Sequence, residues 1–300
     1  WRVLDLCRAE HVAQSLGVLK QFAQDGFCVF DADPRVLEWA DAAADVARDM
    51  LQDADMCALW LRHQDTWFVG VDALSNAVDG SVSNVPLAGP WEALITQPKH
   101  WHRAQVSVVF EGYPKQDVGE SDANHRFRIN RAAAHVDGIL LEDGRRYLRE
   151  PHSFVLGIPL GDSTASPLVV WPRSHILMRD ALRDIIGDKD PKSVDLTEGY
   201  KTARASVFAQ IDPIEVTVVK GQSVLLHRYI LHGVAPWKAT DSAPDEGRMV
   251  AYFRPEYPET DIYMTDINME MLSEGRDRAV NENFASNCHF CQLSGEIIPF

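Results

Sequence analysis

The spacing of hydrophobic positions changes about a third of the way along the chain. In residues 9–24 and 34–61, apolar side chains recur at intervals of three and four, which predicts amphipathic helices. Between them, the apolar run from Gly26 to Phe30 is closed by polar residues and Pro34, and it predicts one short strand. We therefore expect residues 1–100 to form a mainly helical layer.

From about residue 104 the pattern changes to short runs of β-branched and aromatic residues, separated by turn signals such as Glu142-Asp143-Gly144. The one helical stretch expected among them lies near 174–187. The predicted strands are residues 104–110, 127–136, 153–160, 167–171, 214–219, 223–227, 229–234 and 248–254. This order predicts a mainly β fold with a helical buttress, either a β-sandwich or a jelly-roll barrel.

The sequence contains no internal repeat and no long polar linker, so one domain over residues 1–300 is expected. Its barrel core would occupy 101–255 and a C-terminal extension 256–300. With 46% hydrophobic and 24% charged residues, the composition is that of a globular protein. A core of that size needs no disulfide or structural metal.

The formal net charge of −15 argues against nucleic acid and anionic membrane surfaces as partners. A small anionic substrate could bind only where a few arginines are placed locally. Because no apolar run approaches the roughly 20 residues that span a bilayer and no secretory segment is recognised, a cytoplasmic protein is expected. The five cysteines suit reduced thiols, and Cys288 and Cys291 indicate a coincidence or a redox-sensitive tail rather than a zinc site.

Most of the eleven histidines lie in polar or helical surroundings without a partner at ligand spacing. His135-Val136-Asp137-Gly138 differs, because alternation along a strand would put His135 and Asp137 on one face, where both can bind one ion. Gly138 permits a sharp turn beside them. The H-x-D pattern is short enough to arise by chance, so the interpretation requires a third ligand.

The third ligand is expected at His232, which lies among apolar residues before Gly233. Two histidines and one carboxylate form the ligand set of non-haem Fe(II) oxygenases, which leaves three coordination positions free. His227 competes for this role, but its odd spacing from His232 would turn it to the opposite face of a regular strand. A core or supporting role is expected for His227, and also for His152 and His175.

Arginines near the expected site could bind an anionic group. Arg248 and Arg254 share one face of the predicted strand 248–254, and guanidinium pairs with carboxylate through two hydrogen bonds. For a 2-oxo acid that chelates iron, Arg248 is the expected partner of the far carboxylate, with Arg254 as the alternative. Arg131 has the parity of His135 in the predicted strand 127–136, and both a substrate or cosubstrate contact and a salt bridge remain open for it.

In their order along the chain, these residues resemble the phytanoyl-CoA dioxygenase family of Fe(II)/2-oxoglutarate oxygenases, which includes ectoine hydroxylases. The matching motifs are Asp25-Gly26-Phe27-Cys28-Val29, His135-Val136-Asp137, the segment SPLVVWPRSH from Ser166 to His175, His232-Gly233 and Arg248. Two family glycines are replaced, by Ser166 and Arg173. The step from His232 to Arg248 is longer than usual in the family.

The resemblance implies a double-stranded β-helix, the jelly-roll barrel of cupin-like proteins. It also implies Fe(II) held by His135, Asp137 and His232, with 2-oxoglutarate as cosubstrate paired to Arg248, and O2 as oxidant. The implied reaction hydroxylates an unactivated C–H bond of a small molecule while 2-oxoglutarate is decarboxylated to succinate. Halogenases of the same fold have a small residue where Asp137 stands, so the carboxylate favours oxygen insertion.

Two other interpretations remain open at this point. A metal-binding jelly roll without catalytic activity would have the same ligand spacing. A GDS-type esterase is suggested by Gly161-Asp162-Ser163 after an apolar strand, although its base and orienting acid are missing near the C-terminus.

Overall fold

The computed structural model describes residues 17–95, 98, 100–256, 262–266 and 288–292. The expectations for residues 1–16 and for most of the C-terminal extension lie outside this part of the chain. Cys288 and Cys291 fall in β14 (Cys288–Gln292), which pairs in parallel with β13 (Ile262–Asp266), and the side chains of both strands are outside the description. No helix within the described ranges is both long and apolar enough to cross a bilayer.

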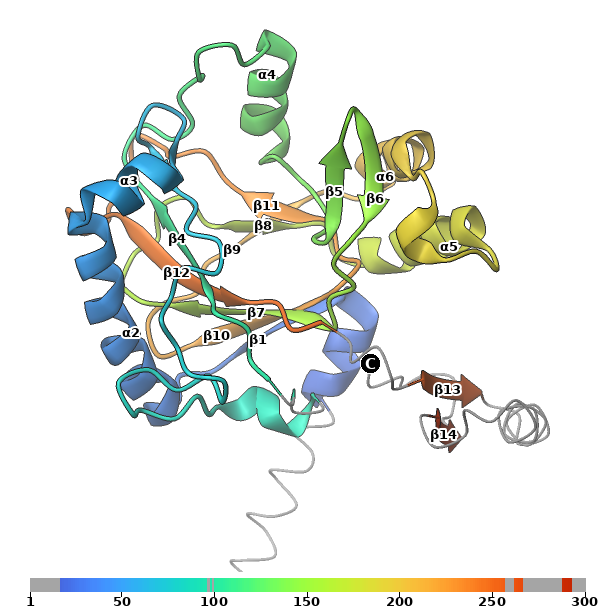
Figure 1. The fold of residues 1–300 in the computed structure, drawn as a ribbon, viewed down its shortest axis with the longest axis horizontal. Coiled ribbons are helices and arrows are strands. Elements are labelled where there is room, and N and C mark those ends of the chain that lie inside the picture. The colour runs from blue at the N-terminus through green and yellow to red at the C-terminus, as the bar shows by residue number, and fades with distance from the viewer. Residues whose placement is uncertain (1–16, 96–97, 99, 257–261, 267–287, 293–300) are drawn as a thin grey trace, which may run out of the picture.

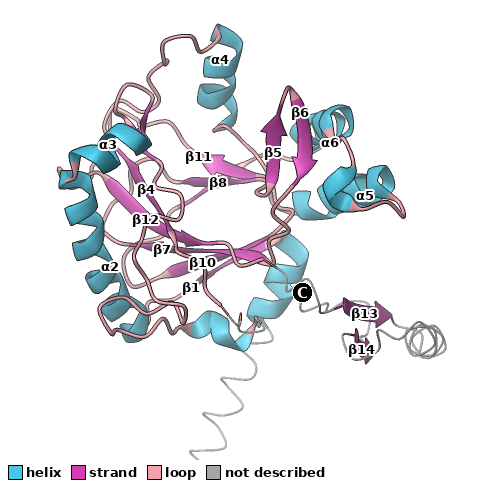
Figure 2. Ribbon diagram, viewed as in Figure 1, coloured by secondary structure: helices cyan, strands magenta, loops and turns pink. Residues whose placement is uncertain are grey.

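Two sheets form the centre of the molecule (Figure 2). The larger sheet is antiparallel, in the order β1-β10-β7-β12-β4-β3-β2, and the smaller has the order β11-β8-β9. The strands of the larger sheet are β1 (Phe27–Phe30), β2 (Leu61–Arg62), β3 (Trp67–Phe68), β4 (Gln105–Val109), β7 (Phe154–Pro159), β10 (Ser223–His227) and β12 (Arg248–Phe253). Those of the smaller sheet are β8 (Leu168–Val170), β9 (Ile214–Val216) and β11 (His232–Val234).

The chain passes between the two sheets in the manner of a jelly roll. It runs from β4 to a single bridge residue, His135, beside β11, then to β7, to β8 and β9, to β10, to β11 and finally to β12. Four strands of the larger sheet thus face three strands and the bridge of the smaller one. This connectivity is the double-stranded β-helix, which confirms the predicted fold class.

Helices cover the outside of the barrel (Figure 1). Figure 1 shows α2 and α3 beside the larger sheet, and α5, α6 and the β5–β6 hairpin on the opposite side. Residues 17–25 are also helical. The remaining elements are α2 (Pro34–Gln52), α3 (Ala54–Trp60), α4 (Asp122–Arg131), α5 (Ser174–Ile186), α6 (Thr197–Gln210), β5 (Ile139–Glu142), β6 (Arg145–Leu148) and two 3-10 turns, Pro90–Ala93 and Pro191–Ser193.

Alternation along the strands sorts side chains between two cores. On β12, Met249, Ala251 and Phe253 belong to the core that packs against α2. The even positions point into the barrel, where Tyr252 borders a smaller core between the sheets. The same alternation directs Arg248 to the barrel interior.

Several local predictions are wrong, for identifiable reasons. The strand expected over 127–136 is not formed, because its first half belongs to α4 (Asp122–Arg131), which Ser121 caps by accepting a hydrogen bond from the Asn124 amide at 3.2 Å. The helix expected over 34–61 breaks at Asp53, whose carboxylate accepts from two amides at the start of α3. Past Trp60, the first hundred residues are mostly strands and loops instead of a helical layer.

The N-terminus of α5 has no side-chain cap, although serine is a residue type favoured at that position. Ser174 does not cap this helix, because its hydroxyl accepts a hydrogen bond from the Leu231 amide at 2.9 Å instead. The capping position is Arg173, which has a left-handed conformation with φ of 67°. Neither α6 nor the β5–β6 hairpin was predicted as an element, although Glu142-Asp143-Gly144 was recognised as a turn.

Candidate metal centre

The three residues expected to bind metal converge at one end of the barrel. His135 and His232 form a two-way backbone bridge, with N–H to O distances of 2.9 and 3.1 Å. Nε2 of His135 lies 3.3 Å from Oδ1 of Asp137, and Nε2 of His232 lies 3.5 Å from Oδ2. All three ligand atoms are within 4.8 Å of one another, and theirs is the one such group among the described His, Cys, Asp and Glu side chains.

The backbone fixes the orientation of both imidazoles. Nδ1 of His135 lies 3.0 Å from the Ala133 carbonyl, and Nδ1 of His232 lies 3.0 Å from the Ile230 carbonyl. A carbonyl can only accept, so each Nδ1 carries a proton and donates it. Nε2 of each ring is therefore the nitrogen that faces Asp137 and is available to a metal ion.

The ligand segment is short because the backbone turns on both sides of it. Ala132 and Ala133 have φ of 49° and 51°, and Gly138 has φ of 77°. A Cβ at Gly138 would collide with the Glu150 carbonyl, so only glycine fits there. Four residues between these two left-handed turns therefore carry two of the ligands.

Asp137 is a buried carboxylate, with 8% of its side chain exposed. Burial alone would raise the pKa of Asp137, but its contacts with His135 and His232 outweigh this and hold the pKa well below its usual range. The pKa of His232 is shifted too: burial lowers it, but the contact with Asp137 produces a net rise. Nη1 of Arg254 lies 3.5 Å from Oδ1 of Asp137 and adds a cation on the same side.

His135 differs from the other two residues because its side chain is 49% exposed. The side chains of Asp137 and His232 are only 8% and 10% exposed. The centre therefore opens to solvent on the His135 side, and a small molecule could approach it there.

Arg248 lies on the inner face of β12 and is 9% exposed. Its Nη2 is 3.4 Å from the Tyr252 hydroxyl, and its buried Nη1 has no hydrogen-bond partner among the described residues. A buried guanidinium with a vacant donor is costly unless a ligand meets it, and a carboxylate is the matching acceptor. Arg254, the alternative, already contacts Asp137.

Arg131 does not occupy the position expected from strand parity. It is exposed at the C-terminal end of α4, and its guanidinium lies 4.8 Å from the centre of the Phe208 ring. The argument for a substrate or cosubstrate contact therefore fails, because it required a strand over 127–136.

His227 and His175 pack together outside the metal group, with ring centres 4.8 Å apart. A Cβ at Gly26 would collide with the His175 ring, and the Gly26 carbonyl accepts from the His227 amide at 2.8 Å. These contacts join the motif that contains Gly26 to the one that contains His175, close to the loop between His227 and His232. Burial lowers the pKa of both histidines, His227 to well below the usual value. The expected supporting role of His227 agrees with this position.

His152 also lies outside the ligand group. Its Nε2 is 3.2 Å from a Glu150 carboxylate oxygen, and 6% of the residue is exposed. It forms an isolated backbone bridge with Glu256, so it ties the start of β7 to the chain after β12. Its position agrees with a supporting role.

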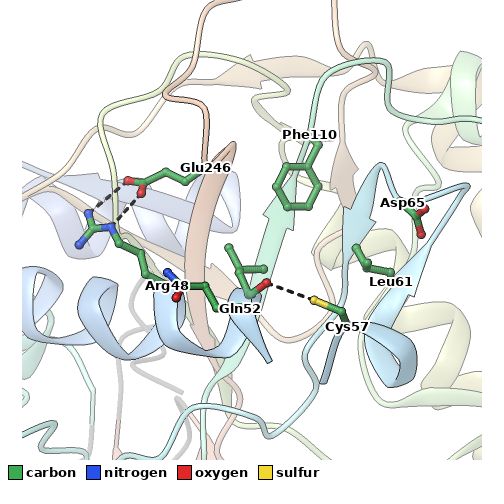
Figure 3. A pocket seen from close by; sticks show the side chains of 8 residues that line it. Arg48, Gln52, Cys57, Leu61, Asp65, Phe110 and Glu246 are labelled. Atoms are coloured by element: carbon green, nitrogen blue, oxygen red, sulfur yellow. Dashed lines mark hydrogen bonds and ion pairs between the residues drawn. The ribbon is translucent and has the colours of Figure 1, made fainter. Parts of the chain in front are cut away.

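A groove on the far side of the larger sheet adjoins the chain just before Arg248 (Figure 3). It has a volume of about 390 Å³ and is lined partly by Leu51, Leu61 and Phe110. Figure 3 shows Arg48 of α2 paired with Glu246 at its edge, with Nε to Oε2 at 2.8 Å. This ion pair joins α2 to the chain two residues before Arg248.

Two residues that sequence reasoning did not identify contact the ligand segment from α6. The Tyr200 hydroxyl accepts a hydrogen bond from the Val136 amide at 3.0 Å, and Nη1 of Arg204 donates to the Ala134 carbonyl at 3.3 Å. The available signal was the apolar spacing of Tyr200, Ala203 and Val207, which are the buried positions of α6.

No protein-family model and no curated protein matches the sequence. Among solved structures, the chain is similar to the non-heme alpha ketoglutarate dependent carbocyclase SnoK from nogalamycin biosynthesis, at 13% identity over 79% of this chain and 81% of that chain, with a TM-score of 0.45. It is similar to EctD from S. alaskensis with bound Fe, at 16% identity over 78% and 74% of the two chains, with a TM-score of 0.39. It is also similar to AviO1 from Streptomyces viridochromogenes Tue57, at 16% identity over 81% and 97%, with a TM-score of 0.37. At these identities and TM-scores, the geometry of the site itself is the basis for a functional proposal.

Proposed function

We propose that the protein is an Fe(II)/2-oxoglutarate-dependent oxygenase that hydroxylates a C–H bond of a small molecule. The observation that carries the proposal is the convergence of two imidazole Nε2 atoms and one buried carboxylate on a single point, with a partly unpartnered buried arginine on the inner face of β12. The order of the sequence motifs supports membership of the phytanoyl-CoA dioxygenase family.

The donor set fits a ferrous ion. Ligand atoms about 2.1 Å from an octahedral metal lie about 3 Å apart on one face. The Nε2 atoms lie 3.3 and 3.5 Å from the two oxygens of Asp137, and the three ligand atoms are within 4.8 Å of one another, so modest side-chain movements would bring them to one ion. When bound, such an ion supplies open positions for a 2-oxo acid and for O2, which together oxidise a nearby C–H bond. His135, Asp137 and His232 would hold it from one side.

The protein's own side chains would bind and orient 2-oxoglutarate and the prime substrate. Arg248 would pair with the far carboxylate of 2-oxoglutarate, because its inward-facing guanidinium has a donor free. The Tyr252 hydroxyl lies 3.4 Å from Nη2 of Arg248 and contacts one side of the guanidinium. The prime substrate would enter beside His135, on the exposed side of the centre.

Water is excluded from behind the site by the apolar core between the sheets. Val170, Leu226 and Ile230 are wholly buried there. Reactive species formed at a metal are shielded from solvent in such a setting. The site is therefore closed at its back and open at its mouth.

The two alternatives have less support. A metal-binding module without activity gives no reason for a buried arginine with a vacant donor. For an esterase, the Ser163 hydroxyl would need a base, but its one hydrogen bond among the described residues is from the Ala165 amide at 3.2 Å.

Spectroscopy of the anaerobic protein tests the proposal. Fe(II) and 2-oxoglutarate added together should give a weak charge-transfer band near about 500 nm. Admission of O2 should then produce one succinate per 2-oxoglutarate consumed. His102→Asn, a change at an exposed histidine outside the centre, should leave both results unchanged. An unchanged spectrum with Fe(II) and 2-oxoglutarate would contradict the proposal.

A further inference from the structure

The backbone of the ligand segment pairs on two edges. Toward β11, His135 exchanges both of its backbone hydrogen bonds with His232. The neighbouring groups, the Val136 amide and the Ala134 carbonyl, point to the other edge, as alternation in an antiparallel strand requires. No strand lies there, because the smaller sheet ends at this segment in the described chain.

Two side chains of α6 take the place of the missing strand. The Tyr200 hydroxyl accepts from the Val136 amide at 3.0 Å, and Arg204 donates to the Ala134 carbonyl at 3.3 Å. Tyr200 and Arg204 are one helical turn apart, so both side chains lie on one face of α6. That face presents one acceptor and one donor, which match the Val136 amide and the Ala134 carbonyl.

Both side chains are themselves firmly held. Tyr200 is 1% exposed, and the guanidinium of Arg204 lies 5.3 Å from its ring centre and 4.6 Å from that of Phe127. The guanidinium of Arg146, from the β5–β6 hairpin, also lies against Tyr200, 5.5 Å from its ring centre. The hydroxyl and the guanidinium are thus fixed by packing before any metal binds.

The segment is short, and it is also held by the two backbone hydrogen bonds with His232 and by the buried side chains of Ala134 and Val136. It is four residues long between the left-handed turns at Ala133 and Gly138, and it carries two of the three ligands. A tilt of its backbone would move the His135 ring and the Asp137 carboxylate relative to His232. On the edge that faces away from β11, the hydrogen bonds to α6 therefore help to set the ligand geometry.

We propose that Tyr200 and Arg204 are positioning residues of the metal centre, which act as a side-chain substitute for a sheet neighbour of residues 134–136. This inference rests on the proposed metal-binding function. It gives α6 a role beyond covering the barrel, since this helix would fix the geometry of His135 and Asp137. Supporting residues of metal ligands commonly change metal affinity by about 10- to 100-fold.

Tyr200→Phe tests the inference, because it removes the hydroxyl and keeps the ring. The matched control is Val207→Ala, which weakens the same helix about 10 Å further along without removing a hydrogen bond from the segment. Two quantities should be measured for each variant: amide hydrogen exchange at Val136 in the metal-free protein, and Co(II) affinity from its visible absorption.

Tyr200→Phe should speed exchange at Val136 selectively and weaken Co(II) binding by about 10-fold or more. Val207→Ala should lower the melting temperature without either selective effect. Arg204→Met should also weaken Co(II) binding. Equal Co(II) affinity in Tyr200→Phe and wild type, with the wild type binding, would overturn the inference alone. A wild type that binds no Co(II) would overturn the proposed metal site and the inference with it.

Discussion

The two halves of the barrel interior differ in whether their inward-facing side chains include polar groups that lack a hydrogen-bond partner. The half formed by β1, β10, β8 and β9 is filled by apolar residues, among them Phe27, Leu226 and Val216. The half formed by β4 and β12 carries Ser107, Arg248 and Tyr252 on the same inner faces. Regular strand alternation produces both, so the difference lies in the residue types alone.

The comparison shows where ligand chemistry can occur. In the apolar half, the inward-facing residues of the core cluster carry no polar side-chain atom. In the polar half the Trp67 indole donates to the Ser107 hydroxyl at 3.0 Å, yet Arg248 keeps a buried donor without a partner in the described structure. A buried unsatisfied donor costs about 1–3 kcal/mol, which a bound anion would recover.

The largest effect is expected from Asp137→Ala. This change leaves two histidines and no carboxylate, so affinity for Fe(II) should fall by more than about 100-fold. Calorimetry or Co(II) absorption would measure it. Retained tight binding would show that the metal lies elsewhere.

Arg248→Met is expected to act on the cosubstrate instead of the metal. Loss of one partner of a buried charge pair costs about 2–5 kcal/mol, so the Kd for 2-oxoglutarate should rise between about 30-fold and several thousand-fold. Fe(II) binding should change little. Arg35→Gln, which removes a charge from an exposed salt bridge, is the control. A larger effect from Arg254→Met would transfer the cosubstrate role to Arg254.

In the apolar half, Leu226→Ala should affect stability alone. A buried Leu→Ala change costs about 2–5 kcal/mol, visible as a lower urea midpoint. Metal affinity of the folded fraction should remain that of the wild type. A selective loss of metal affinity would break the division between a filling half and a binding half.

A smaller effect is expected on the free energy of unfolding below neutral pH, and its source is His227 at the end of β10. Burial, with a further contribution from His175, Arg228 and Arg179, holds the pKa of His227 well below its usual value. The unfolded chain therefore binds the proton first, so stability is complete above about pH 6.5 and falls as the pH drops below it. The slope is at most about 1.4 kcal/mol per pH unit for one histidine.

Urea unfolding at a series of pH values between about 7.5 and 5.5, the range in which histidine titrates, would measure this slope. His227→Phe should flatten the dependence relative to wild type. An identical dependence in the two proteins would exclude His227 as its source.

The smallest effect is expected at Ser166, which stands where the family that the sequence resembles has a glycine. Ser166 has φ of 43°, and its buried hydroxyl has no partner in the described part of the chain. Ser166→Gly should raise the free energy of unfolding by about 1 kcal/mol. Ser166→Ala separates the two causes, because it removes the hydroxyl and keeps the backbone strain. A loss of stability in Ser166→Gly would contradict this reading.

Much of the barrel was predictable because its strands have clear boundaries and one consistent inner face. β7, β10 and β12 follow the predicted runs within a residue or two at each end. The same alternation, with a turn at Gly138, predicted that His135 and Asp137 would lie together. His232 was identified from its apolar surroundings, and the structure brings it to the same point.

The failures arise where tertiary contacts outweigh local pattern. α4 has no buried side chain, so it shows no apolar stripe, and its β-like pattern misled the prediction. Ser174 looks like a helix cap in sequence, but the Leu231 amide takes its hydroxyl. The contact between Tyr200 and Val136 joins parts of the chain that no local pattern relates.

The most direct test of the central claim is anomalous scattering at the iron edge from crystals grown without oxygen and soaked with Fe(II) and 2-oxoglutarate. The account predicts one peak about 2.1 Å from Nε2 of His135, Nε2 of His232 and a carboxylate oxygen of Asp137, with the far carboxylate of 2-oxoglutarate on Arg248. The absence of a peak among these three side chains, under conditions that saturate the protein with iron, would contradict it.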